Sequence, residues 1–175
     1  MQTHRPPHIF QPDSLYFVTA STWNKEKFFD DDAKLTAFAS LLHKDIKIYG
    51  IKLEAWVVLQ NHYHIIIHVD ALELLPKFIR KFHSDSALYI NKFDNNKKRK
   101  VWYQYWERLI RTEEDFYTRI NYIHNNSIKH GISNSMDDYK FSSYHDYANT
   151  KGKEWLQDCF EKYLVIDFSV PEDVD

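Results

Sequence analysis

Apolar residues recur along the chain with two different periods, and each period predicts one kind of element. Alternation with a period of two, in segments rich in β-branched and aromatic residues, is typical of strands. Recurrence at three and four residues is typical of a helix with one buried face. On this basis strands are expected at 15–23, 51–59, 62–69 and 101–106. Helices are expected over 30–50, 72–93 and 112–126.

Residues with strong capping preferences mark the ends of these helices. An acidic run at 30–32 precedes the first helix, and Gly50 follows it. The segment 112-TEED-115 resembles a capping box, and Gly131 comes after the last helix. The order β-α-β-β-α-β is that of the ferredoxin-like split motif, an α+β fold whose antiparallel sheet carries two helices on one face. The helix that begins near residue 112 is then an addition after this core.

The length of 175 residues favours one domain, because such a chain can bury a core without disulfides or metals. We expect residues 1–150 to form the ferredoxin-like core with its added helix, and residues 151–175 to form a C-terminal extension. After Asn134 the pattern predicts no further element, and 169-SVPEDVD-175 has the composition of an acidic tail.

Cysteine usage and the N-terminal sequence bear on the compartment. Cys159 is the only cysteine, which excludes an intrachain disulfide and a zinc site built from cysteines. The opening MQTHRPPHIF lacks the apolar core of a signal peptide, and no apolar run approaches about 18 residues. A cytoplasmic protein without membrane association is therefore expected.

The net charge of −2 hides an uneven distribution. Residues 76–111 hold ten basic and three acidic side chains, a net charge of +7, so the rest of the chain carries −9. Because local charge decides which partners a face attracts, this segment is a candidate surface for a polyanion. A solvated face without any partner is the alternative.

Aromatic residues make up 17% of the chain, and several stand directly beside this basic segment. Cations next to aromatic rings suit the phosphates and unpaired bases of a single nucleic-acid strand. The rings of Trp102, Tyr103 and Trp106 are candidates for stacking, or they pack the sheet against the added helix. The candidate nucleic-acid-binding residues are Arg80, Lys81, Lys97, Lys98, Arg99, Lys100, Trp102, Tyr103, Arg108 and Arg111.

The motif 62-HYH-64 opens the third expected strand. Side chains alternate along a strand, so His62 and His64 share a face, roughly 7 Å apart. Two neutral imidazoles so placed can bind one metal ion, although the pair alone is more typical of structural histidines. His68 shares the face but lies roughly 13 Å beyond the pair, which favours a packed or surface position.

The added helix supplies a reason for a metal. Tyr122 and Asn126 are four residues apart and therefore share one helical face. Beside a divalent ion that polarises a phosphodiester, a tyrosine hydroxyl can attack phosphorus and form a covalent phosphotyrosine. The amide oxygen of Asn126 would complete the coordination of Mg²⁺ or Mn²⁺ begun by the histidines. Tyr117 is an alternative nucleophile, and Asn121 or Asn125 an alternative ligand.

Three blocks in this order resemble the REP-associated tyrosine transposases, which belong to the HUH-type single-tyrosine transposases. The resemblance extends from about residue 9 to residue 147. It departs from the usual pattern where Leu59-Gln60 replaces Met-Pro, where Asn126-Ser127 replaces Asn-Pro, and where Tyr63 is bulkier and more polar than usual. The blocks are 55-AWVVLQNHYHIIIHV-69, 102-WYQYWERLIRTEEDF-116 and 122-YIHNNSIKHGI-132.

The resemblance implies a metal motif at His62 and His64, a nucleophile at Tyr122 and a further ligand at Asn126. It implies binding of hairpin-containing single-stranded DNA and cleavage to a 5′-phosphotyrosine and a free 3′-OH. Rejoining is by the reverse attack, without a nucleotide cofactor, and a monomer is favoured over a homodimer. Two alternatives are a hairpin-binding regulatory module that does not cut, and a metal-dependent phosphodiesterase without a covalent intermediate.

Overall fold

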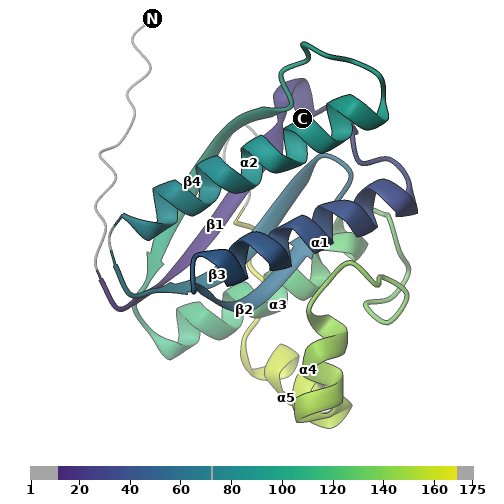
Figure 1. Cartoon of the computed structure of the whole chain (residues 1–175). Helices are drawn as coiled ribbons and strands as arrows, with labels where there is room; N and C mark the ends of the chain where they lie inside the picture. The colour runs from purple at the N-terminus through teal and green to yellow at the C-terminus, as the bar shows by residue number, and fades with distance from the viewer. Residues whose placement is uncertain (1–11, 72, 169–175) are drawn as a thin grey trace, which may run out of the picture.

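The computed structural model describes residues 12–71 and 73–168, and within them four strands form one antiparallel sheet in the order β2-β3-β1-β4 (Figure 1). The N-terminal segment, Leu72 at the predicted start of the second helix, and the tail 169–175 lie outside the described residues. The strands are β1 (Ser14–Thr22), β2 (Lys52–Val58), β3 (His62–Val69) and β4 (Trp102–Ile110).

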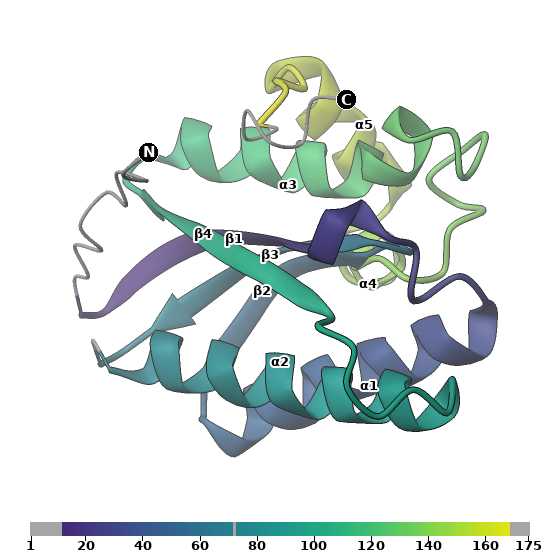
Figure 2. The same ribbon diagram turned by 90° about the horizontal axis from the view of Figure 1, so that it is seen from above.

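The helices cover the two faces of the sheet separately. Figure 2 shows α1 and α2 together on one face, and α3 on the opposite face with α5 beyond it. The order of the core elements and the strand order confirm the ferredoxin-like α+β fold. The helices are α1 (Asp32–Ile48), α2 (Leu74–Phe93), α3 (Glu113–Lys129), α4 (Tyr144–Lys151) and α5 (Lys153–Lys162), and a short 3-10 turn, η1 (Trp23–Lys25), follows β1.

Alternation along β3 assigns its side chains to two different environments. Tyr63 lies among the aromatic rings under α1 and α2, with its ring centroid 5.4 Å from that of Phe82. The imidazole of His64 points to the opposite face, where its ring centroid lies 5.1 Å from that of Tyr122. The extra polarity of Tyr63 is satisfied in the core, because its hydroxyl lies 2.9 Å from Nε2 of His83 on α2.

Trp102 belongs to the core under α1 and α2. Only 7% of the residue is exposed, its ring stacks on His83 at 4.5 Å, and its indole nitrogen donates to Ser86 Oγ at 3.0 Å. The ring therefore has no free face to offer to a base, which corrects the expectation that Trp102 stacks on nucleic acid. Tyr103, the next residue, is 41% exposed.

The observed ends of the helices confirm the capping predictions. The side chain of Asp31 accepts from the backbone N–H of Lys34, and that of Thr112 accepts from Asp115. Gly131 follows α3 with a φ of 64°, a left-handed conformation that glycine adopts without strain. β4 is longer than predicted, and its pairing with β1 runs to Ile110.

The segment 141–143, for which no element was predicted, covers the open edge of β2. Ser142 forms an isolated bridge with Val57, and the backbone N–H of Ser143 donates to the Trp56 carbonyl at 2.8 Å. The Ser143 hydroxyl accepts from the Trp56 N–H at 3.0 Å and lies 3.0 Å from Nε2 of the buried His124. An edge strand that would otherwise be open to another chain is covered in this way.

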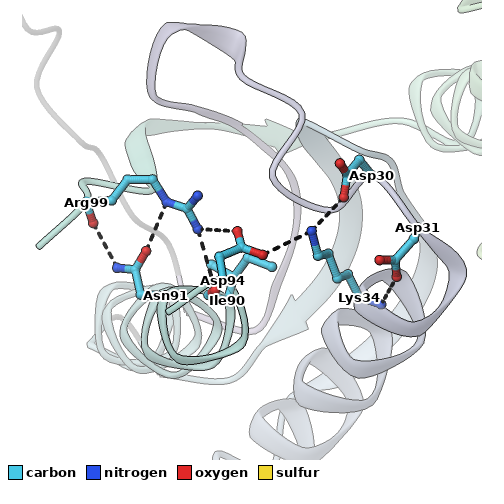
Figure 3. Close-up of polar contacts among 7 residues, drawn as sticks. All are labelled: Asp30, Asp31, Lys34, Ile90, Asn91, Asp94 and Arg99. Carbon is cyan, nitrogen blue, oxygen red and sulfur yellow. Dashed lines mark hydrogen bonds and ion pairs between the residues drawn. The ribbon is translucent and has the colours of Figure 1, made fainter. Parts of the chain in front are cut away.

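The basic loop between α2 and β4 is anchored by ion pairs (Figure 3). Arg99 donates to Asp94 at 2.7 Å and to the side chain of Asn91 at 3.0 Å. Lys34 on α1 pairs with Asp94 at 3.1 Å and with Asp30 at 2.7 Å. The loop is thus fixed to both helices of this face. In the described part of the chain, no helix combines the length and apolar character needed to cross a bilayer.

Candidate active site

A pocket of about 370 Å³ lies where the start of β3 meets the C-terminal half of α3. Both histidines of the motif and Tyr122 line it, so the structure brings together residues that are about sixty positions apart in the sequence. The turn η1 and the residues after it supply two lysines to its rim. The lining residues are Ser21, Lys25, Lys27, Gln60, Asn61, His62, His64, Tyr122, His130 and Ile132.

The ring of His62 is held through both of its nitrogens. Nδ1 lies 2.7 Å from the side-chain oxygen of Asn61, and Nε2 lies 3.2 Å from the side-chain oxygen of Asn126. When Nδ1–H donates to Asn61, Nε2 is left with its lone pair directed at Asn126. Two acceptors then face each other, an arrangement that is satisfied by a cation between them or by rotation of the Asn126 amide.

His64 is fully enclosed. Its ring stacks on Phe17 with centroids 5.6 Å apart and meets the edge of Tyr122 at 5.1 Å. Neither ring nitrogen has a hydrogen-bond partner among the residues that the structure describes. A buried imidazole without partners is costly, so this position favours a ligand that the described residues do not supply.

Both histidines are neutral at physiological pH. Burial, followed by the charge of His130, lowers the pKa of His62 to about 3. Burial, followed by the charge of His62, holds the pKa of His64 well below its usual value. Each ring therefore has a lone pair available as a ligand.

These residues fit a divalent metal ion. Two unprotonated imidazoles and one amide oxygen form a donor set that Mn²⁺ and Mg²⁺ accept. Neighbouring ligands of an octahedral ion lie about 3 Å apart, and the ligand atoms of His62 and Asn126 are 3.2 Å apart. The amide nitrogen of Asn126 is buried without a partner among the described residues, and the amide oxygen is the atom that faces His62.

Tyr122 is 2% exposed and occupies the wall of the pocket next to His64. Lys129, two turns further along α3, places Nζ 3.5 Å from the tyrosine hydroxyl. Burial is the largest single effect and lowers the pKa of Lys129, but the hydrogen bonds and charges of Asp167 and Tyr122 together raise it above its usual value, so the ammonium stays charged. Phe168 packs edge-on against the Tyr122 ring at 5.4 Å. The nearby Tyr117 stacks on Tyr163 at 5.0 Å and does not line the pocket.

His130 and Lys129 were not predicted as site residues. The ring centroid of His130 lies 4.6 Å from that of His62, and both rings line the pocket. The helix was expected to end near residue 126, whereas it continues to Lys129 and carries one further turn past Asn126. The spacing of four between Asn126 and His130 would have indicated a shared face if the helix had been extended.

The predicted nucleic-acid-binding residues divide into engaged and exposed groups. Arg99 is pinned by Asp94, and Lys81 forms an ion pair with Asp85, so both contribute to the fold. Arg108 shares its register position with Phe17 and therefore faces the α3 side of the sheet. Arg108 is nevertheless exposed, and the other exposed candidates are Arg80, Lys97, Lys98, Lys100, Tyr103 and Arg111.

His68 lies apart from the pocket. Its Nε2 is 3.0 Å from Asp13 and its Nδ1 is 3.2 Å from Asp70. Among the described histidines, cysteines and carboxylates, these three form the only group with all ligand atoms within 4.8 Å of one another. Both imidazole nitrogens face carboxylates, and the acidic side chains are exposed. The contacts between His68 and the two aspartates therefore explain the geometry of the group without a metal ion.

The sheet, the histidine pair and the tyrosine-bearing helix define a protein of the single-tyrosine transposase class. The sequence model of the family described as "Transposase IS200 like" matches residues 12–126, and the chain belongs to this family.

Similar proteins carry a more particular name. A REP-associated tyrosine transposase of Escherichia coli K12 is 28% identical over 142 residues, covering 74% of this chain and 80% of that protein. A candidate REP-associated tyrosine transposase of Haemophilus influenzae is 25% identical over 153 residues, covering 78% and 82%. These relatives confirm the resemblance to REP-associated tyrosine transposases that the sequence blocks indicate.

Two solved structures share the fold. The structure of a REP-associated tyrosine transposase bound to a REP hairpin superposes with a TM-score of 0.68 at 20% identity, covering 86% of this chain and 87% of that one. A candidate transposase of Deinococcus radiodurans has a TM-score of 0.50 at 16% identity, covering 69% and 96%.

Proposed function

We propose that this transposase binds single-stranded DNA containing a hairpin, and that it cuts and rejoins this DNA through a phosphotyrosine at Tyr122 with the help of Mn²⁺ or Mg²⁺. A related transposase has been solved with a REP hairpin, which supports a hairpin as the bound form. The observation that carries the chemistry is the convergence of Tyr122, His62 and His64 in one pocket.

The residues of the pocket have three different roles: metal binding, nucleophilic attack and stabilisation of charge. His62, His64 and Asn126 would hold the metal, which when bound polarises the scissile phosphate and lowers the cost of its developing charge. The Tyr122 oxygen forms a bond to phosphorus as the bond between phosphorus and the 3′ oxygen breaks. The phenolic proton passes to water, and the departing 3′ oxygen takes a proton from water, so the step is balanced overall. The charged Lys129, 3.5 Å from the tyrosine hydroxyl, stabilises the phenolate.

Rejoining is the same step in reverse. A free 3′-OH attacks the phosphotyrosine, loses its proton and restores the phosphodiester, while Tyr122 regains its hydroxyl proton. Because the tyrosine–phosphate bond retains the energy of the original ester, no nucleotide cofactor is needed. Enclosure of the tyrosine, which is 2% exposed, protects the intermediate from water.

Replacement of Tyr122 by phenylalanine tests this proposal. Tyr122→Phe removes the attacking oxygen and keeps the buried ring, so we expect no covalent protein–DNA product and unchanged hairpin affinity. The measurement is a denaturing gel with labelled hairpins from sequence flanking the gene, in Mn²⁺ or Mg²⁺. Tyr117→Phe is the matched control on the same helix and should form the product normally.

The outcome also separates the alternatives. Cleavage that persists in Tyr122→Phe but disappears in His64→Ala would indicate a metal-dependent phosphodiesterase without a covalent step. Binding without cleavage in the wild type, with several flanking hairpins and either metal, would favour a regulatory binding module. The buried ring nitrogens of His64, which have no hydrogen-bond partner in the described part of the chain, argue for the metal-dependent enzyme over the binding module.

A further inference from the structure

Three aromatic side chains lie together where β4 begins, and we call them the aromatic platform: Trp23, Tyr103 and Trp106. The ring centroid of Tyr103 is 5.6 Å from that of Trp23 and 6.1 Å from that of Trp106. The planes are inclined by 50° and 44°, so the rings do not close into a parallel stack. Tyr103 is 41% exposed, and both tryptophans are partly exposed. Each ring thus keeps surface available outside the core.

The platform is tied to the active-site pocket through the backbone. Trp23 belongs to η1, the same turn that supplies Lys25 to the pocket rim. The N–H of Trp23 donates to Val101 at 2.7 Å, and the N–H of Thr22 donates to Asn61 at 2.8 Å. Figure 2 shows the purple turn after β1 beside the start of β4. A single DNA strand that leaves the pocket over η1 would therefore reach the aromatic platform directly.

Positive charge accompanies the exposed rings. Lys100 places Nζ 3.5 Å from the centroid of Trp23 and 5.7 Å from that of Tyr103. Lys97 and Lys98 are exposed in the loop just before, and the ion pairs of Arg99 fix that loop in place. Rings interspersed with ammonium groups suit a ligand that combines flat faces with negative charge, and unpaired nucleotides have this chemistry. An apolar protein partner would be matched by a continuous apolar patch instead.

We propose that the aromatic platform stacks the bases of unpaired nucleotides flanking the hairpin, while Lys100 contacts their phosphates. The inference deepens the proposed function, since it rests on the binding of hairpin DNA, but it does not depend on cleavage. It gives the protein a second contact with its substrate, separate from the pocket, through which the single-stranded flank is held in line with Tyr122.

The test compares two substrates and two variants by fluorescence anisotropy in chelator. One substrate is the hairpin with its single-stranded flank, and the other is the same hairpin without it. We expect Tyr103→Ala to weaken binding of the flanked hairpin about tenfold, or about 1.4 kcal/mol, and to leave the unflanked hairpin unaffected. Tyr103→Phe keeps the ring and should bind both as the wild type does.

Abasic nucleotides in the flank separate stacking from charge, because they remove bases and keep phosphates. The wild type should lose the same factor of about ten, and Tyr103→Ala should lose nothing further. Equal weakening of both substrates by Tyr103→Ala, or indifference of the wild type to abasic flanks, would overturn the platform. Trp23→Ala provides an independent second variant with the same expected pattern.

Failure of the platform and failure of the cutting mechanism give different results. If the affinity depends on the flank bases but no covalent product forms, the proposal for the platform is supported and cleavage by Tyr122 is contradicted. If the covalent product forms while flank bases have no effect on affinity, cleavage stands and the platform falls. Tyr122→Phe should retain the full dependence on flank bases, because its substitution leaves the platform intact.

Discussion

Asn61 is the residue on which the orientation of the His62 ring depends. Its oxygen accepts a hydrogen bond from Nδ1–H of His62 at 2.7 Å, and its amide nitrogen donates to the carbonyl of Lys25 at 2.9 Å. The side chain thus connects the start of β3 to the turn η1 and, with Nδ1 as the donor, leaves the lone pair of His62 Nε2 directed at Asn126. The departure at Leu59-Gln60 leaves this arrangement intact, because the asparagine that follows it is present.

Removal of this side chain should weaken metal binding. In Asn61→Ala the His62 ring loses its tautomer and orientation, and such changes next to a ligand typically cost about 10–100-fold in metal affinity. Titration calorimetry with Mn²⁺ measures this without reference to DNA cleavage. Asn149→Ala, on the exposed face of α4, is the matched control, and equal affinity in the two variants would contradict the role of Asn61.

At the same level, the aromatic residues show where sequence periodicity stops being informative. The pairing of β4 with β1 shifts register between Ala20 and Thr22, so Tyr105 and Trp102 both face α2 although they are three residues apart. A prediction that assumes strict alternation through this register shift assigns the aromatic side chains beyond it to the wrong face of the sheet. The histidine pair and Tyr122 were predictable because regular strand and helix spacing holds there.

Among the elements, the core strands and helices were predicted from the periodicity of apolar residues. The elements that depend on contacts between residues far apart in the sequence were not. The end of β4 depends on its pairing with β1, and the segment 141–143 gains its structure only by lying against β2. α5 is likewise tied to α3 by the Asn121 side chain, which donates to the carbonyls of Cys159 and Tyr163. No local pattern encodes such contacts, so the C-terminal region was not predictable.

The contact between the segment 141–143 and the edge of β2 should weaken when the Ser143 hydroxyl is removed. Ser143→Ala leaves the Trp56 N–H and Nε2 of His124 without their shared partner, and each unsatisfied buried group costs about 1–3 kcal/mol. Hydrogen exchange should show faster exchange of the Trp56 amide, and urea unfolding should show a lower free energy of unfolding. Ser40→Ala, exposed on α1, should change neither. Unaltered exchange at Trp56 would contradict the contribution of this edge.

For the whole molecule, buried neutral histidines set how stability depends on pH. Burial lowers the pKa of His83 and of His124 to about 3. Unfolded histidines bind protons near pH 6.5 and the folded ones do not, so stability is fully present above that pH and is lost as pH falls from 6.5 toward 3. Each contributes roughly 2 kcal/mol of loss between pH 7.5 and 5.

Urea unfolding in chelator at pH 7.5 and 5 measures this loss. The free energy of unfolding should fall at the lower pH, and His124→Gln should fall by about 2 kcal/mol less than the wild type over the same interval. A free energy that does not change between the two pH values would show that these histidines are not held in their neutral form.

The packing of α3 against its own sheet has a consequence for the kinetics of the proposed cutting reaction. Tyr122, the histidine pair and Asn126 lie together within a single chain, so under this proposal one molecule holds all of the reactive groups. With DNA saturating, the fraction of molecules that form the covalent product in a given time should stay constant when the protein is diluted a hundredfold. A tyrosine supplied by a second molecule would instead make that fraction fall with dilution. The reaction should therefore be first order in this protein. In a cell, a single molecule should be enough to start it, without a threshold concentration for dimer assembly.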